Sequence, residues 1–324
     1  MKLGRIAASL VSMAMVAGLG AAPALAAPVP DSNTDGYTDV RAKNVMEAMF
    51  SDYVTKAPKG VNDWSCKLTP KHPKPIILLH GAYMSAYTAW SDFGPRLAEE
   101  GFCVYSINYG REEDSAFAKM FELNGTGDIS KSVEQVSAFV KAVVEYTGAK
   151  KATVVGYSEG GLQGQLMLKR HGAKYVDRFI TIGGVQKGTT LMGIAKLIPQ
   201  LQSVGVDVTP LVAKFGGQGT NDMVVGSAVV KEANAGGDVI PGVQYTAISS
   251  KYDGVAYPLE NTQFTPGPNV KNIVLQDGCS KDFSEHLSQV YSERVYALLL
   301  NELYGKKVVE VPCEAVLPFL GSAK

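Results

Sequence analysis

Residues Val154 to Gln165 read VVGYSEGGLQGQ, which places Ser158 between Gly156 and Gly160. The β-branched residues before the serine predict a buried strand, and the residues after Gly160 have the spacing of a helix. A serine at a sharp turn between a buried strand and a helix is typical of a nucleophile elbow. Glycines are expected beside it, because side chains would crowd such a turn. A Gly-x-Ser-x-Gly run is weak evidence alone, so the rest of the chain must supply the partners of Ser158.

Apolar, β-branched runs alternate with stretches of helical period along the chain. The predicted strands are residues 75–81, 102–110, 152–158, 179–185, 244–250 and 272–277. The predicted helices are residues 89–100, 129–146, 162–170 and 283–303. Several strands are apolar throughout, which is typical of a parallel sheet covered on both faces. The alternation predicts an α/β fold with a mostly parallel sheet of about six strands and helices on both faces.

The amino-acid composition of the chain is typical of a globular protein. The chain has 324 residues, of which 46% are hydrophobic and 19% charged, enough for one sizeable core. We expect one main domain over residues 63–324, preceded by a polar N-terminal extension over residues 27–62. Lys and Arg balance Asp and Glu at 31 each, so no excess positive charge is available to bind phosphates. Nucleic acid is therefore not an expected partner.

The interval between the strands ending at residue 185 and beginning at residue 244 is longer than one crossover helix needs. Its first part, residues 191–202, places apolar side chains on one helical face, and a glycine-rich run follows at residues 215–219. Residues 189–240 therefore either cover the site as a lid or cap that touches a lipid surface, or pack on the sheet as ordinary helices. The pattern leaves both alternatives open.

The first 26 residues have the form of a secretory signal peptide. Lys2 and Arg5 precede an apolar run over residues 6–22, and the small-residue sequence A-L-A follows at 24–26. The run is rich in Ala, Gly and Ser and ends at Pro23, which does not suit a membrane anchor. We expect cleavage near Ala26, secretion, and no transmembrane segment in the mature chain.

Export would place the four cysteines in an oxidising compartment, where an even count indicates disulfides. Three pairings are formally open. Cys66 and Cys103 precede consecutive strands, and Cys279 and Cys313 flank the last helix, so the pairs Cys66–Cys103 and Cys279–Cys313 need the least chain travel. The sequence contains no C-x-x-C or H-x-x-x-H spacing, so we expect neither a metal site nor a cofactor.

A serine hydroxyl needs a base, and the chain has four histidines. His72 lies in a proline-rich loop, His80 ends the first strand, and His171 ends the helix after Ser158. His286 follows the last strand. Loops at the carboxyl ends of parallel strands meet over one crevice, so His286 is the candidate base.

The base needs an orienting carboxylate. Asp253 follows the strand over residues 244–250 and has apolar and aromatic neighbours that would shield its contact with an imidazole. Asp277, Asp282 and Glu285 are local rivals. With Asp253 the order along the chain is Ser, Asp, His, which is the order of the α/β-hydrolase triad.

An ester hydrolase also needs donors for the oxyanion of its tetrahedral intermediate. These are usually the backbone N–H after the nucleophile and one after the first core strand. The expected donors are the amides of Glu159 and Ala82, with Tyr83 less favoured than Ala82. The Glu159 carboxylate would have to point away from the developing charge.

These motifs resemble the bacterial secreted lipases called class 2 lipases, which belong to the α/β-hydrolase superfamily. The resemblance runs from about residue 63 to residue 313. It rests on DWSC, PIILLHGAYMSAYTAW, EEGFCVYSINYG, VVGYSEGG, KYDGVAYP and His286. It implies hydrolysis of fatty-acid esters without a metal, by a triad of Ser158, Asp253 and His286. The chain departs from the family at Tyr157 and Glu159, where these lipases commonly have histidine and glutamine, and at Ala256, where a second valine is common.

We therefore expect a secreted serine ester hydrolase acting on a lipid or small ester substrate, with transient contact to a lipid interface. Three alternatives use the same fold. An acyltransferase would pass the acyl group to another alcohol, a polyester or cutin hydrolase would cleave a different ester, and a hydrolase-like binding protein would not react at all.

Overall fold

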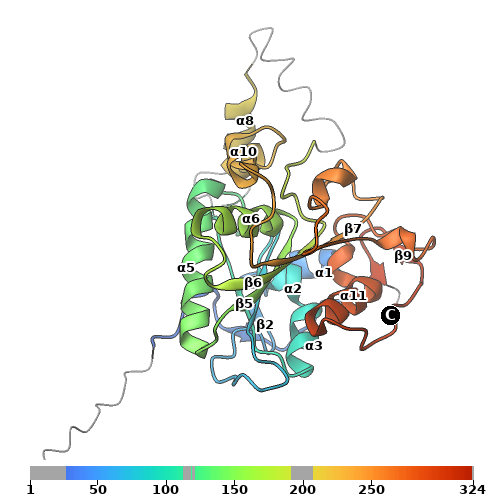
Figure 1. The fold of residues 1–324 in the computed structure, drawn as a ribbon. Coiled ribbons are helices and arrows are strands. Elements are labelled where there is room, and N and C mark those ends of the chain that lie inside the picture. Colours follow the sequence, from blue (N-terminus) through green and yellow to red (C-terminus); the bar gives the residue numbers. More distant parts are fainter. Residues whose placement is uncertain (1–26, 112–117, 119–120, 191–206, 323–324) are drawn as a thin grey trace, which may run out of the picture.

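The computed structural model describes residues 27–111, 118, 121–190 and 207–322 (Figure 1). The expected signal peptide, residues 1–26, and the apolar run expected at residues 191–202 lie outside the described residues. Within the described ranges, no helix is long and apolar enough to cross a membrane.

A six-stranded parallel sheet forms the centre of the molecule, in the order β4-β3-β5-β6-β7-β8. Its strands are β3 (Ile76–Leu79), β4 (Val104–Ile107), β5 (Ala152–Tyr157), β6 (Val176–Ile182), β7 (Gln244–Ser249) and β8 (Val270–Val274). Each coincides with a predicted strand apart from its ends, which confirms the predicted fold class. The chain steps from β3 outward to β4 and then returns to the other side of β3 as β5. The loops after β3 and β5 therefore diverge, and in such sheets the crevice at this point holds the ligand.

Helices cover both faces of the sheet (Figure 1). They are α1 (Val45–Met49), α2 (Ala86–Trp90), α3 (Phe93–Glu99), α5 (Ile129–Thr147), α6 (Glu159–His171), α8 (Thr209–Gly216), α9 (Gln218–Asp222), α10 (Ala228–Asn234) and α11 (Glu293–Tyr304). Alternate strand residues point to opposite faces. Ile77 and Leu79 thus belong to the apolar cluster that includes α5, α6 and α10, whereas Ile76 and Leu78 belong to the cluster that includes α1, α2, α3 and α11. Two apolar clusters, one on each face, hold the sheet in place.

Helix α5 shows how the sequence specifies one of these layers. The side chain of Asp128 accepts a hydrogen bond from Ser130 N–H and caps the first turn, and the apolar stripe is buried against the sheet. Gly148 ends the helix with φ = +67°, a conformation that glycine adopts without a steric cost. Here the predicted helix and the observed one agree closely.

The helix predicted over residues 89–100 is two short helices, α2 and α3. Pro95 has no N–H to donate to the carbonyl of Ser91, so a continuous helix cannot pass through this point. Asp92, which separates the two helices, instead forms ion pairs with Arg41 and Arg96.

The helix predicted over residues 283–303 begins only at Glu293. Ser292 caps its first turn by accepting from Val295 N–H. The preceding residues are held in a loop by their own side chains, because Asp282 accepts from Ser284 N–H (2.8 Å) and Glu285 accepts from the N–H groups of the two residues that follow His286. The prediction failed because local side-chain bonds replaced the helical ones.

The segment expected as an N-terminal extension packs into the main core. Strand β1 (Tyr37–Thr38) pairs with β2 (Ala57–Pro58), and α1 lies between them in the chain. The side chains of Asn33 and Asn108 each donate to the backbone carbonyl of the other. Buried Val45 and Ala48 join the apolar cluster of α2 and α11. This segment therefore forms part of the wall on that face of the sheet.

The described part of the expected lid, residues 189–190 and 207–240, contains α8, α9 and α10, and Figure 1 shows α8 and α10 near its top. Helix α10 packs on α6 and buries Val229, Val230 and Ala233, as an ordinary covering helix does. Helix α8 has no buried residue. Helix α10 is thus part of the covering layer, whereas α8 lies exposed at the surface.

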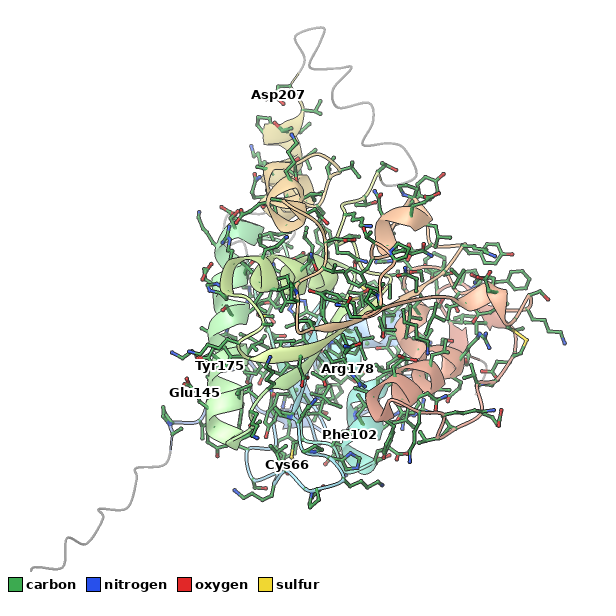
Figure 2. The ribbon with its side chains drawn as sticks, viewed as in Figure 1. Cys66, Phe102, Glu145, Tyr175, Arg178 and Asp207 are labelled. Carbon is green, nitrogen blue, oxygen red and sulfur yellow. A yellow bond between two sulfur atoms is a disulfide. The ribbon has the colours of Figure 1, made fainter. Side chains whose placement is uncertain are left out.

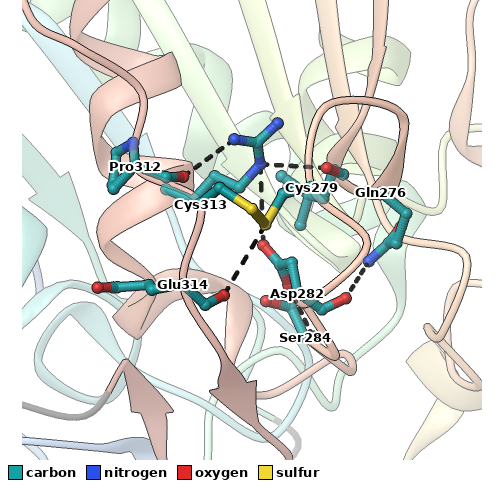
Figure 3. The surroundings of a disulfide bond; sticks show 9 residues. Gln276, Cys279, Asp282, Ser284, Pro312, Cys313 and Glu314 are labelled. Atoms are coloured by element: carbon teal, nitrogen blue, oxygen red, sulfur yellow. Dashed lines mark hydrogen bonds and ion pairs between the residues drawn. A yellow bond between two sulfur atoms is a disulfide. The ribbon is translucent and has the colours of Figure 1, made fainter.

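The cysteines are joined in the pairs that the sequence favours, Cys66–Cys103 and Cys279–Cys313. Figure 2 shows Cys66 and Phe102 at the opposite end of the molecule from Asp207, which precedes α8. Cys103 directly precedes β4, so the first disulfide lies near the amino ends of the strands. The second, shown in Figure 3, connects the segment after β8 to the segment after α11.

Candidate active site

Ser158 lies at the turn from β5 to α6 in a conformation that residues with a side chain rarely adopt. Its φ is +54° and its ψ is −119°. Such strain persists only where neighbouring structure imposes it. Here Ser158 N–H donates to Ile182 O (3.1 Å), and Ser158 O accepts from Gly161 N–H (2.9 Å) and Val185 N–H (3.1 Å). These bonds fix the turn and lift the hydroxyl above the end of the sheet.

The glycines around Ser158 allow a close approach of backbone and sheet. A Cβ atom at Gly156 would lie 2.3 Å from Gly160 O, and one at Gly160 would lie 2.4 Å from Leu79 O. One turn into α6, a Cβ at Gly164 would lie 2.4 Å from the ring of Phe179. Any side chain at these positions would therefore push the helix away from the sheet and displace the serine.

The structure brings the three side chains expected to act together into one hydrogen-bonded line. His286 Nε2 lies 2.8 Å from Ser158 Oγ, and His286 Nδ1 lies 2.7 Å from Asp253 Oδ2. The three residues follow β5, β7 and β8, whose carboxyl ends share one edge of the sheet. All three are at least 95% buried. This geometry suits a hydroxyl, a base and an orienting carboxylate.

Asp253 is held in a single orientation by donors on both oxygens. Oδ1 accepts from Val255 N–H (2.9 Å) and Ala256 N–H (2.7 Å). Oδ2 accepts from Gln289 Nε2 (2.7 Å) while it faces His286 Nδ1. A carboxylate is an acceptor only, so this ring of donors suits its ionised form.

The rival carboxylates do not bond to His286. Asp277 is exposed and forms an ion pair with Lys251 at 2.6 Å. Asp282 and Glu285 accept from backbone N–H groups of the His286 loop itself. They shape the loop, whereas Asp253 contacts the imidazole.

The loop after β3 is arranged to present the Ala82 amide. His80 Nδ1–H donates to Gly81 O (2.8 Å), and His80 Nε2 accepts from Tyr109 N–H (3.3 Å), which assigns the tautomer. Burial lowers the pKa of His80 to about 4, so the ring is neutral. The C=O and N–H of a trans peptide point in opposite directions, so fixing Gly81 O turns the Ala82 N–H away from the His80 ring.

The two expected oxyanion donors lie beside the serine. A Cβ atom at Gly81 would lie 3.0 Å from Ser158 Cβ, which places the Gly81–Ala82 peptide against the elbow. Glu159 is the first residue of α6, and neither its N–H nor that of Ala82 donates to an atom of the described residues. Two unpaired amides next to a buried hydroxyl form an arrangement that can hold an oxyanion.

The other histidines have structural surroundings. His72 is buried between the rings of Phe102 (4.0 Å between centroids) and Tyr304 (5.5 Å). His171 Nε2 lies 3.1 Å from Glu134 Oε2 on the surface. Neither is bonded to Ser158.

Gln289 and Tyr157 make contacts at the site that the sequence did not predict. Gln289 donates to Asp253, and the Tyr157 hydroxyl donates to His286 O (2.9 Å) while its ring stacks on the imidazole at 5.1 Å. Burial, the largest cause, raises the pKa of Tyr157 well above its ordinary value, so its hydroxyl stays a donor. The sequence singled out Tyr157 only as a position where class 2 lipases commonly have histidine. Gln289 lies in a segment that was predicted to be helical.

An apolar pocket of about 630 Å³ opens beside the loop after β3, residues 80–85, which carries the expected oxyanion donor Ala82 and is called the oxyanion loop below. The pocket begins at Tyr83, the residue after Ala82, whose hydroxyl is hydrogen-bonded to Thr220 Oγ1. Its walls come from the C-terminal end of α1, the oxyanion loop, the segment before α5, and α8. The lining residues are Met49, Phe50, Tyr83, Phe121, Leu123, Val212, Phe215 and Gly216.

Among the described residues, no three His, Cys, Asp or Glu side chains are grouped so that they could hold a metal ion.

Comparison with protein families gives one match over most of the chain. The model of the family described as Lipase (class 2) matches residues 73–298, which include Ser158, Asp253 and His286. Among solved structures, Bacillus licheniformis lipase BlEst2 in its mature form has a TM-score of 0.51 at 18% identity, covering 73% of this chain and 94% of that chain. At this identity the likeness concerns the fold alone.

Curated relatives match a smaller part. The chain is 27% identical over 144 residues to a triacylglycerol lipase of Pseudarthrobacter phenanthrenivorans, and 25% identical over 134 residues to one of Vibrio cholerae. These alignments cover 43% and 41% of this chain. They span 41% and 39% of the relatives, about two fifths of their length.

Proposed function

This chain belongs to the class 2 lipase family, and from that premise we propose that it is a secreted serine hydrolase that cleaves carboxylic esters of fatty acids through an acyl-enzyme. One observation carries the proposal. The hydroxyl of Ser158 is within hydrogen-bonding distance of His286, which is in turn bonded to Asp253. The two amides of Ala82 and Glu159 lie beside that hydroxyl.

The first half of the reaction forms the acyl-enzyme. His286 Nε2 takes the proton of Ser158 Oγ as this oxygen attacks the ester carbonyl, and the carbonyl oxygen becomes an oxyanion held by the Ala82 and Glu159 amides. Asp253 holds Nδ1–H of His286 and stabilises the imidazolium. When the tetrahedral intermediate collapses, its bond to the alcohol oxygen breaks, and His286 gives its proton to the departing alcohol.

The second half releases the acid. A water molecule gives a proton to His286 as it attacks the acyl carbonyl, and the same two amides hold the second oxyanion. Its collapse breaks the bond to Ser158 Oγ, which takes the proton back from His286. Fatty acid leaves, and the starting arrangement is restored.

The apolar pocket fits the acyl part of such a substrate. Gly81 lies against Ser158 and Tyr83 lines the pocket, and their Cα atoms are at most about 7.6 Å apart, since consecutive Cα atoms are separated by about 3.8 Å. This short link supports an acyl chain that runs from Ser158 toward the pocket. If a methylene occupies about the same 30 Å³ as a water molecule, the volume of about 630 Å³ accepts a long chain.

Secretion is supported by two features. The basic and apolar residues at the N-terminus have the order of a signal peptide. The two disulfides, Cys66–Cys103 and Cys279–Cys313, suit an oxidising compartment and are rare in a reducing cytosol.

The test is hydrolysis of p-nitrophenyl esters of increasing acyl length by the purified chain. We expect release of free fatty acid and a rate at least about a thousandfold lower for Ser158→Ala, because removal of a triad member leaves only the oxyanion donors and binding. An S158A variant as active as the wild type would reject the site. Acyl transfer to an added alcohol as the main product would instead identify an acyltransferase.

A further inference from the structure

The side chain of Glu159 has no part in the reaction described above, yet it is completely buried beside the site. It has no exposed surface. Oε1 accepts from Gln163 Nε2 (3.0 Å), and Gln163 Nε2 also donates to Ser132 Oγ (2.6 Å) on α5. Oε2 has no hydrogen-bond partner among the described residues. A buried carboxylate with an unpaired oxygen is costly, so the neutral acid is favoured.

The unpaired oxygen lies close to the oxyanion loop. Gly125 has φ = +63°, and a Cβ atom there would lie 3.1 Å from Glu159 Oε2, 3.0 Å from Ala82 Cα and 2.9 Å from Gly81 O. Only the width of one glycine therefore separates the carboxyl group from the backbone that carries the Ala82 amide. The other expected donor amide belongs to Glu159 itself.

Within the part of the chain that the structure describes, no cation compensates a charge at this position. Asp222 on α9 and Tyr83 and Tyr109 from two loops are the titratable groups that interact with Glu159, and it forms no ion pair with a described Lys, Arg or His. Both oxygens of Asp222 accept hydrogen bonds, from Ile129 N–H (2.9 Å) and from Gln218 Nε2 (2.9 Å). Burial first, and Asp222 in addition, raise the pKa of Glu159 to about 8.

On the premise of the proposed ester hydrolysis, we propose that Glu159 is a positioning residue whose carboxyl group must be uncharged during turnover. The reaction builds negative charge on the substrate oxygen between the Ala82 and Glu159 amides. A carboxylate in the same buried space would repel that charge and pull polar groups of the loop toward itself. The protonated acid does neither.

The test is the pH dependence of kcat for a short-chain p-nitrophenyl ester between pH 6 and 9, with the S158A rate subtracted as background. Wild-type kcat should fall by up to about tenfold by pH 9 as Glu159 loses its proton around pH 8, with a smaller change in KM. Glu159→Gln, which has the same shape and no charge, should not show this fall. Glu99→Gln, at an exposed position on α3, should keep the wild-type profile. Parallel profiles of wild type and E159Q would overturn the inference.

Asp222→Asn gives a second readout. Removing the charge of Asp222 lowers the pKa of Glu159, so kcat should begin to fall at a lower pH than in the wild type. An unmoved profile in a folded D222N protein would also overturn the proposal. Failure of the proposed function looks different, because S158A would then hydrolyse the ester as fast as the wild type at every pH.

Thermal unfolding separates this role from a purely structural one. The pKa of Glu159 is raised above its ordinary value of 4.5, so its contribution to stability is fully present below about pH 4.5 and is lost as the pH rises through about 8. The Tm of the wild type should therefore decrease relative to that of E159Q between pH 5 and 9. A Tm difference without the difference in kcat would reduce Glu159 to a structural residue and contradict the inference.

Discussion

At the scale of single residues, the site depends on side chains that restrict one another. Ser158 is held in a strained conformation, His286 is stacked on Tyr157, and Asp253 is ringed by donors. Among the described residues, two side chains bond to Asp253, those of His286 and Gln289, and the other donors are backbone amides. Gln289 therefore offers a way to loosen Asp253 without touching the three expected catalytic groups.

Replacing Gln289 with Leu should lower kcat about tenfold and change KM little. Loss of the 2.7 Å bond leaves Asp253 Oδ2 with His286 alone, while Oδ1 keeps its two backbone donors, so Oδ2 is held less firmly and the imidazole is less well oriented. Steady-state kinetics on a p-nitrophenyl ester would measure this. Gln276→Leu, which alters a glutamine bonded to Ser250 Oγ and the Asp282 carbonyl instead, is the matched control. Equal kcat in Q289L and wild type would show that Asp253 needs no side-chain support.

At the scale of elements, the loop between β8 and α11 carries His286 and has almost no regular structure. It is held by the Cys279–Cys313 disulfide and by Arg294, whose guanidinium donates to Leu275 O (3.1 Å) and Pro312 O (3.0 Å). Figure 3 shows Gln276, Asp282 and Pro312 gathered around this disulfide. The crosslink thus restricts the segment that leads to the imidazole.

Replacing Cys279 and Cys313 together with Ala should lower both the Tm and kcat. Opening a loop of 34 residues costs between about 3 and 4.7 kcal/mol in the chain-entropy model, and the freed segment holds His286 less firmly. Differential scanning calorimetry and kinetics below the Tm would separate the two effects. The control is Cys66→Ala with Cys103→Ala, which opens a loop of similar length, 37 residues, at the amino ends of the strands. That variant should lose stability but keep its kcat. An equal loss of kcat in the two double variants would contradict a specific role of the Cys279–Cys313 disulfide in holding the His286 loop.

At the scale of the whole molecule, the fold assembles one apolar pocket from segments far apart in the chain. Met49 and Phe50 come from the N-terminal segment, Leu123 from the stretch before α5, and Phe215 from α8. Helix α1 packs on α2 and α8 packs on α9, so these segments reach the pocket through different neighbours. The pocket and its proposed acyl chain therefore depend on how the layers pack and not on any one motif.

Replacing Leu123 with Trp should fill the pocket and shift the preference toward short acyl chains. Each methylene that can no longer be buried removes about 0.8 kcal/mol, roughly fourfold in kcat/KM, so a twelve-carbon ester should lose far more than a four-carbon one. Phe50→Ala should lower kcat/KM for long-chain esters, because it removes part of one wall of the pocket. The chain-length series measures both variants, and Phe319→Ala, which removes another exposed aromatic ring outside the pocket, is the control. An unchanged profile in L123W would show that the acyl chain lies elsewhere.

Much of the architecture could be predicted from the sequence because it is encoded locally. Apolar runs and helical periods located the six strands and α5, and the turn glycines located Ser158. The sequence also singled out Asp253 and His286, which the structure places in hydrogen-bonding reach, while their catalytic role stays a proposal. Local patterns misled where side chains competed with the helix, as at Pro95 and in the loop that carries His286.

The sequence by itself determined the order of strands and helices, the fold class, and which residues had the chemistry to act together. Only the tertiary structure decided that Gln289 supports Asp253, that the Glu159 carboxyl group is buried without a full set of partners, and that Phe50 faces the oxyanion loop's pocket. Periodicity and turn chemistry depend on neighbours within a few residues, so a linear pattern records them. Burial and hydrogen bonding depend on which distant segments pack together, and that is settled only when the whole chain has folded.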